Sequence, residues 1–304
     1  MKMKQFSLEP FFPAPIAGRQ SAGTRRHQGI PGIEILPSGR LFAVWYGGEI
    51  AGEGPGNYVV LAVSTDCGRS WREIQVVAPP ASAAASERAF DSTLWLDPAG
   101  RLWWFWSQCV APKLWDIFDG RHGVWASVCD APDTDSRRIA EGVMMNKPEL
   151  LADGGWALPT ALWSLYPEKI PAEYRPLAYP NLSVSHDNGA SFELVTGADV
   201  PERWFDEHMM IERKDGSWWL LVRTHYGIGQ AFSSDRGKSW HDIGDSGLGG
   251  PNSRFAVRRL KSGRLLLVNH QSPLPLPGEK RQTWGGAREK LTAWLSDDDG
   301  RSWY

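Results

Sequence analysis

The segment Ser233-Ser-Asp235-Arg-Gly237-Lys-Ser-Trp240 has the form S-x-D-x-G-x-S-aromatic, and the chain repeats this form. The other copies are Ser64-Thr-Asp-Cys-Gly-Arg-Ser-Trp71, Ser185-His-Asp-Asn-Gly-Ala-Ser-Phe192 and Ser296-Asp-Asp-Asp-Gly-Arg-Ser-Trp303. An aspartate accepts hydrogen bonds from backbone amides just ahead of it, and a glycine two residues later allows a positive φ. Each copy, called a box below, therefore predicts a tight hairpin turn with a structural aspartate. We expect its aromatic residue to fill the gap between neighbouring hairpins.

A second repeat alternates with the boxes. Apolar strands break at a glycine turn and resume, around Gly39, Gly100, Gly154, Gly216 and Gly263. Together the two repeats give about four strands per unit of about 50–60 residues, which is typical of propeller blades. One box is absent between Ser64 and Ser185, where Ser127-Val-Cys-Asp130 has the pattern of a degenerate copy. The sequence thus predicts one all-β propeller domain over residues 1–304, with five blades represented.

Composition excludes several classes of function. The net charge is −2, from 33 basic and 35 acidic residues, so there is no basic excess for nucleic acid. No apolar run approaches the length of about 18 residues that a membrane helix needs. The N-terminal residues include no long apolar stretch of a secretory signal, so we expect a cytoplasmic protein. Three cysteines without CxxC spacing, and histidines without metal-ligand spacing, predict neither a metal site nor a cofactor.

The boxes and hairpins resemble those of the BNR/Asp-box sialidase (neuraminidase) superfamily over the whole chain. The resemblance implies a sialidase-like propeller that is six-bladed by design. Five blades are found before Tyr304, so a sixth blade, or most of it, is expected to be missing at the C-terminus. Alternatively, the N-terminal segment and a shortened ring compensate.

The same resemblance implies a site in which three arginines bind a sugar carboxylate. An acidic residue is the acid/base, and a glutamate activates a tyrosine nucleophile. Glu207 and Arg223 match the family's glutamate and second arginine on either side of the Gly216 turn. A hairpin brings its outer ends together, so we expect these two residues to pair. Arg288, which leads a strand into the last box, resembles the third arginine.

Further carboxylates are expected from the first two blades. Asp91, with Arg88 three residues before it, resembles the segment that contacts the sugar ring. The acid/base aspartate of the family has no counterpart in the glycine-rich loop 47–58, which offers Glu49 and Glu53 instead. We assign Glu53 to this role, and we count Glu53, Asp91 and Glu207 as the predicted catalytic residues.

Other side chains are expected to enrich the same site. Arg254 is a candidate on the inner strand of the fifth blade, Lys147 precedes that of the third, and His208 follows Glu207. The family's tyrosine nucleophile would lie in the missing blade. Within this chain, we name Tyr226 as the candidate tyrosine at the site. The family's first arginine is also absent, since Gly29-Ile-Pro31 stands in its place, and Arg25 and Arg26 lie nearby.

These features predict an exo-acting glycosidase that removes a terminal acidic sugar from a glycan. Because the first arginine is absent, the terminal sugar is expected to be either sialic acid or a uronic acid. Two alternatives stay open: a propeller that binds glycans without cleaving them, and a polysaccharide lyase acting on uronic-acid glycans. We expect Glu53, Asp91, Glu207, Arg223 and Arg288 to converge on the propeller axis, because each flanks an innermost strand.

Overall fold

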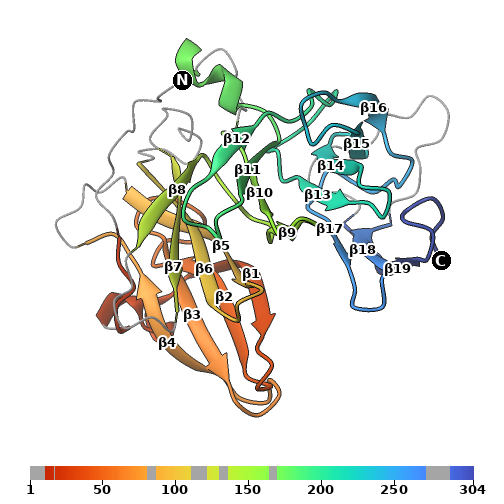
Figure 1. Cartoon of the computed structure of the whole chain (residues 1–304). Helices are drawn as coiled ribbons and strands as arrows, with labels where there is room; N and C mark the ends of the chain where they lie inside the picture. Colours follow the sequence, from red (N-terminus) through yellow and green to blue (C-terminus); the bar gives the residue numbers. More distant parts are fainter. Residues whose placement is uncertain are drawn as a thin grey trace. The chain divides into compact units, whose positions relative to one another are not determined.

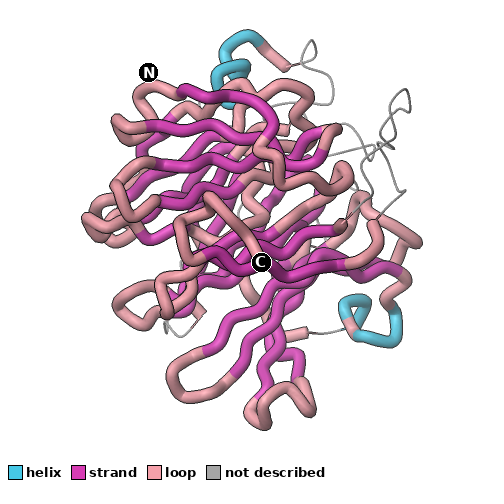
Figure 2. The backbone as a smooth tube through the Cα atoms, turned by 90° about the vertical axis from the view of Figure 1, so that its right-hand side faces the viewer, coloured by secondary structure: helices cyan, strands magenta, loops and turns pink. Residues whose placement is uncertain are grey.

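The structure is a computed structural model that describes residues 11–16, 18–80, 87–110, 122–129, 136–163, 170–271 and 288–304. Strands dominate it, and its described helices are the short 3₁₀ helices η1 (Gly18–Gln20), η2 (Ala22–Thr24) and η4 (Ala172–Leu177) (Figure 2). The chain forms two compact units, Met1–Lys147 with Tyr166–Arg175 and Pro148–Leu165 with Pro176–Tyr304. The predicted all-β propeller class is confirmed, with five blades present.

The first unit contains two four-stranded antiparallel blades, in each of which every strand pairs with the next one along the chain (Figure 1). The first blade comprises β1 (His27–Ile35), β2 (Leu41–Gly48), β3 (Tyr58–Ser64) and β4 (Arg72–Val77). The second comprises β5 (Glu87–Leu96), β6 (Leu102–Val110), β7 (Gly123–Val128) and β8 (Arg137–Glu141).

The second unit contains two further four-stranded blades and one three-stranded blade, with the same order of strand pairing. The third blade comprises β9 (Glu149–Leu150), β10 (Trp156–Thr160), β11 (Asn181–Ser185) and β12 (Glu193–Val195). The fourth comprises β13 (Met209–Glu212), β14 (Trp218–Thr224), β15 (Gly227–Ser233) and β16 (His241–Asp245). The fifth comprises β17 (Ala256–Arg259), β18 (Leu265–His270) and β19 (Leu291–Ser296). In the last blade, Tyr304 exchanges two backbone hydrogen bonds with Leu295, in the place where the other blades have a fourth strand.

The glycine turns lie where the sequence predicts them. Gly39, Gly100, Gly154, Gly216 and Gly263 each join the first two strands of a blade, and their φ angles fall between 82° and 87°. A side chain is strained in this left-handed region, whereas glycine adopts it freely. The five hairpins are therefore copies of one turn.

The four boxes share one pattern of hydrogen bonds, and the copy at Ser233 illustrates it. The buried Ser233 hydroxyl donates to Asp235 at 2.8 Å and accepts the Gly237 N–H at 2.7 Å. Asp235 also accepts the N–H and the hydroxyl of Ser239, which lower the pKa of its carboxyl to about 2. The structural role predicted for the box aspartates is thus confirmed. The residue before the glycine, Arg236 in this copy, is also left-handed, which the sequence does not reveal.

The box aromatics pack between blades in the second unit. Trp240 packs against a core cluster shared by the third and fourth blades, and Trp303 against a cluster shared by the fourth and fifth. In the first unit the first box differs, because Trp71 is 42% exposed, although it donates its indole N–H to the box glycine as Trp303 does. The predicted aromatic plug is therefore present between the third and fourth blades and between the fourth and fifth blades.

The segment that leads into β13 is held in a strained conformation. Glu202, Phe205 and Asp206 have φ angles of 55°, 60° and 41°, which cost non-glycine residues on the order of 1–3 kcal/mol each. The Trp204 N–H donates to the carbonyl of Arg223 on β14, and this bond ties the segment to its neighbouring strand. Such strain persists only where surrounding contacts enforce it.

Two side chains enforce it. Arg203 donates to Asp206 at 2.5 Å and to Asp199 at 3.0 Å, although burial still raises the pKa of Asp206 to about 6. The ring nitrogens of buried His208 face the carbonyl oxygens of Asp206 and Asn181 at 2.7 and 2.5 Å. Those carbonyls favour a charged ring, but the loss of hydration outweighs them and lowers the pKa of His208 to about 4.

We expect Ser233→Ala to lower the free energy of unfolding by about 1–3 kcal/mol, because the buried Gly237 N–H loses its acceptor. Ser239→Ala is the matched control, since it removes an exposed hydroxyl from the same aspartate and should cost about 0.5 kcal/mol or less. Urea unfolding measures both values. Equal losses in the two variants would contradict the hydrogen-bond account of the box.

We expect His208→Gln to flatten the pH dependence of stability between pH 6.5 and 4. The unfolded ring binds a proton below pH 6.5, whereas the folded ring stays neutral until about pH 4, so stability falls as pH falls through this window. The contribution reaches about 3 kcal/mol at pH 4. The opposite contribution of Asp206 is present in both proteins and cancels in the comparison.

Denaturant unfolding of wild type and variant at several pH values measures this difference. His186→Gln is the control, because the His186 side chain is half exposed. Parallel curves for wild type and His208→Gln would show that His208 titrates normally in the folded protein.

Candidate functional site

The predicted Glu207–Arg223 pair forms in the second unit. Arg223, at the end of β14, donates to the Glu207 carboxylate at 2.7 Å, and both side chains are buried. The Arg223 guanidinium also lies over the ring of Phe205, with its central carbon 5.4 Å from the ring centroid. The strained segment before β13 therefore places both a carboxylate and an aromatic face against one guanidinium.

Asn252, in the loop before β17, joins Arg223 to Arg288. Arg223 donates its Nε to the Asn252 side-chain oxygen at 2.6 Å and one Nη to the Asn252 backbone carbonyl at 3.2 Å. Arg288 donates to the same carbonyl at 3.3 Å. The Asn252 side-chain nitrogen lies 3.3 Å from Nδ1 of His225. Two of the predicted arginines thus meet at one buried, neutral residue.

Three other predicted residues lie in this unit. His208 is fully committed to two backbone carbonyls, so it holds the segment beside Glu207 in place. Arg254 lies two residues after Asn252 and is half-buried. Tyr226 lies in the turn between β14 and β15, also half-buried.

In the first unit, the loop that carries Glu53 is fixed to the second blade. The Gly56 N–H donates to the carbonyl of Glu87 at 2.8 Å, and the Ala89 N–H donates to the carbonyl of Asn57 at 2.9 Å. The buried Asn57 side chain accepts the Gly54 N–H and closes the loop on itself. These bonds attach the Glu53 loop directly to β5, the strand of Arg88 and Asp91.

A buried tyrosine links the predicted carboxylates of this unit. The Tyr46 hydroxyl, near the end of β2, hydrogen-bonds to exposed Glu53 and feels the charge of Asp91. Burial first, and then these negative charges, raise the pKa of Tyr46 far above its ordinary value, so its hydroxyl keeps its proton. Tyr46 is therefore a hydrogen-bond donor toward Glu53.

Asp91 and Arg88 occupy unusual positions on β5. Asp91 is buried with a φ of 42°, within a β-bulge between Phe90 and Thr93. Bulges turn a side chain out of the regular alternation and are frequent beside active sites. Arg88 is 2% exposed and lies over the ring of Phe90 at 4.1 Å. Among the described residues, no hydrogen-bond partner faces its Nε or one Nη.

The predicted site residue Lys147 bonds to the first strand of the first blade. Its ammonium donates to the Glu34 carboxylate at 2.7 Å and to the Ile33 carbonyl at 2.6 Å, both on β1. These bonds give Lys147 a structural role within the first unit. Nearby in sequence, burial raises the pKa of Glu149 on β9 to about 7, so this carboxyl titrates near neutrality.

The structure therefore brings the predicted residues together in two groups. Glu53, Asp91 and Arg88 surround Tyr46 in the first unit, and Glu207, Arg223 and Arg288 surround Asn252 in the second. The convergence of the two groups on one axis stays a prediction. Neither Tyr46 nor Asn252 was predicted from the sequence, because a tyrosine in an apolar strand and an asparagine in a loop are ordinary in any protein.

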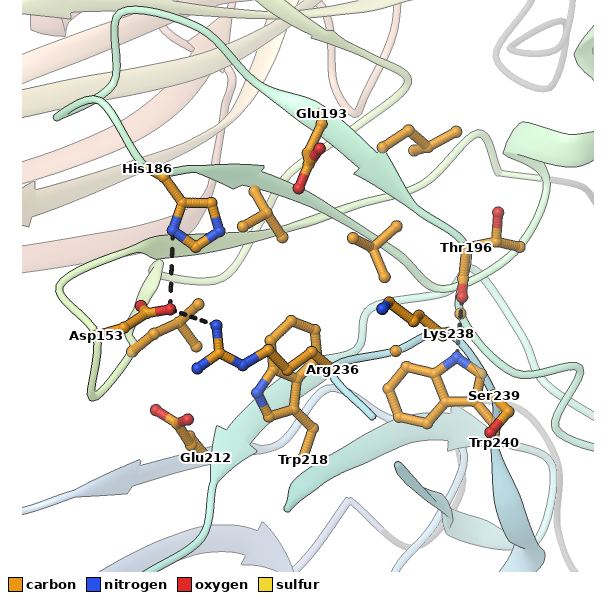
Figure 3. A pocket seen from close by; sticks show the side chains of 16 residues that line it. Asp153, His186, Glu193, Thr196, Glu212, Trp218, Arg236, Lys238, Ser239 and Trp240 are labelled. Atoms are coloured by element: carbon orange, nitrogen blue, oxygen red, sulfur yellow. Dashed lines mark hydrogen bonds and ion pairs between the residues drawn. The ribbon is translucent and has the colours of Figure 1, made fainter. Parts of the chain in front are cut away.

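A separate groove of about 680 Å³ lies between the third and fourth blades. Figure 3 shows Asp153 between His186 and Arg236, with distances of 3.9 and 2.7 Å, respectively. Glu212, which also lines the groove, ends β13, whereas Glu207 precedes that strand. None of the predicted site residues lines this groove, and its ion pair joins the turn of one blade to the box of the next.

Neither a metal site nor a membrane span is found in the described part of the chain. No group of three His, Cys, Asp or Glu side chains there is arranged to hold a metal ion. No helix there is long and apolar enough to cross a bilayer.

Solved structures with the same fold include sialidases. A Hadza microbial sialidase, Hz136, matches with a TM-score of 0.64 and 15% identity over 91% of this chain and 57% of its own. A Trypanosoma rangeli sialidase in complex with sialic acid matches with a TM-score of 0.62 and 15% identity, over 90% of this chain and 47% of its own. The chain thus spans about half the length of these two sialidases.

A protein of unknown function from Dyadobacter fermentans matches over more of its length. Its TM-score is 0.65 at 14% identity, covering 96% of this chain and 84% of that one. No curated protein sequence matches significantly. The model of the BNR repeat-like domain matches residues 39–304. The chain therefore belongs to the BNR repeat-like domain family and has the β-propeller fold of the sialidases.

Proposed function

We propose that this protein is an exo-acting glycoside hydrolase that removes a terminal acidic sugar from glycans. The observation that carries the proposal is the meeting of Arg223 and Arg288 at Asn252, directly beside the carboxylate of Glu207. Arg223 is buried and paired with Glu207, whereas Arg288 is exposed. A sugar carboxylate suits a neighbouring pair of guanidinium groups, because its two oxygens match the planar donors of arginine.

Arg88 supports an anionic substrate independently. Its guanidinium is buried against Phe90, and two of its nitrogens face no acceptor among the described residues. Donors that lose water without gaining an acceptor are unfavourable in the free protein. An oxygen of a bound sugar that reaches these nitrogens would remove this cost.

The carboxylates supply the acid–base chemistry. Glycosidases need one group that protonates the leaving oxygen and a second that activates or provides the nucleophile. Glu207, oriented by its ion pair with Arg223, is the proposed base that activates the nucleophile. Exposed Glu53, with Tyr46 as its hydrogen-bond donor, is the proposed acid/base. Asp91, directed by the bulge, is the proposed contact to the sugar ring.

The sugar can be sialic acid or a uronic acid. Structures of sialidases with this fold, one of them bound to sialic acid, support the first. The Gly29-Ile30-Pro31 sequence in place of the family's first arginine supports the second. A lyase would use a histidine or tyrosine base, and two residues do not suit that role, because two backbone carbonyls hold His208 and Tyr46 keeps its proton. His225 and Tyr226, which follow Arg223 in the chain, keep a lyase as the alternative.

We expect Glu207→Gln to lower kcat by on the order of 10²–10⁴-fold on sialosides or uronosides, because the amide cannot accept a proton. Arg223→Ala should mainly raise KM, by an amount equivalent to about 2–5 kcal/mol of binding free energy. Steady-state kinetics on both substrate classes measure these effects. Reducing ends indicate hydrolysis, and near-ultraviolet absorbance of the product indicates lyase action.

The control is Glu212→Gln, which makes the same chemical change at the other end of β13 and should leave the kinetics unchanged. Wild-type kinetics in both Glu207→Gln and Arg223→Ala would refute the assignment of the site. Binding without any product would instead establish a glycan-binding propeller.

A further inference from the structure

The residue on which the two arginines converge is an amide and carries no charge. Asn252 is 1% exposed, and its two oxygens receive three hydrogen bonds, two from Arg223 and one from Arg288. Both guanidinium groups approach within 3.3 Å of the same backbone oxygen. Two cations held this close repel one another, so their arrangement depends on acceptors that lie between them.

An amide oxygen and a carboxylate oxygen accept the same hydrogen bond with different electrostatic results. The Asn252 side-chain oxygen fixes Nε of Arg223 at 2.6 Å and leaves the guanidinium charge intact. An aspartate of the same shape would form an ion pair at this position and would repel an incoming carboxylate. Arg223 already pairs with Glu207, and asparagine orients it without adding a second carboxylate.

The orientation of the amide also bears on His225. Because Arg223 has only donors, the oxygen of Asn252 must face it, and the amide nitrogen then faces Nδ1 of His225 at 3.3 Å. Nδ1 of His225 then accepts the amide N–H, and the His225 ring packs against Trp204 with centroids 4.6 Å apart.

We propose that Asn252 is a specificity-determining residue that holds the arginine pair in position for a ligand carboxylate and adds no negative charge to that of Glu207. The inference rests on the proposed function and adds to it. It assigns the selection of acidic over neutral sugars to the neutral side chain at position 252.

Asn252→Asp, made in the full chain, tests the proposal with nearly no change of shape. The probes are N-acetylneuraminic acid, glucuronic acid and galactose, with binding measured by calorimetry. We expect the variant to bind whichever acid wild type prefers at least tenfold more weakly, with no matching loss for galactose. Its melting temperature should stay the same or rise, because the new carboxylate pairs with Arg223.

The matched control is Asn269→Asp, which adds a buried carboxylate to the same blade. The Asn269 amide contacts Leu248, Gln271 and Trp294, so this variant should keep the wild-type affinity for the acidic sugar. Equal affinity of Asn252→Asp and wild type for the acid would overturn the proposal while the proposed function stands. A loss of melting temperature with equal weakening for acid and galactose would also overturn it, by showing a purely structural role. Wild type that binds neither acid would overturn the proposed function and this inference together.

Discussion

The hydrogen bond between the first serine and the aspartate of each box is the interaction on which the rest of the structure depends. It buries the serine hydroxyl, satisfies the glycine N–H, and leaves the aspartate free to accept two further bonds. The turn so formed reverses the chain between the third and fourth strands of a blade. Without it, the left-handed residue before the glycine would have no compensation for its strain.

In the second unit the boxes also fix the order of the blades. Asp299, in the last box, accepts the Lys214 N–H from the Gly216 turn of the preceding blade at 2.6 Å. Arg236, in the box before, pairs with Asp153 in the Gly154 turn. The boxes of the fourth and fifth blades therefore each reach the first hairpin of the blade before them. The opposite end of the fourth blade carries the strained segment and the buried ion pair between Glu207 and Arg223.

The fold could be predicted from the sequence because its determinants are local. A box or a glycine turn specifies its own conformation within eight residues, and repetition at regular spacing then defines the blades. The pairing of Glu207 with Arg223 was equally accessible, since a hairpin brings its two ends together. Long-range contacts were not accessible. Tyr46 and Asn252 have no local signal, and Lys147 is held by Glu34, more than a hundred residues away in the sequence.

The meander of every blade has a kinetic consequence. Each strand pairs with the strand that follows it. The connections from β10 to β11 (residues 161–180) and from β18 to β19 (residues 271–290) are long, but the glycine turns and the boxes close short loops, whose entropic cost is low. Hairpins of this kind form in about 1–10 μs, much faster than sheets with distant strand partners. The slow events should be those that join one blade to the next, through box aromatics such as Trp240 and Trp303. An all-β protein of this design is therefore expected to acquire its blades early and to have its folding rate set by their docking.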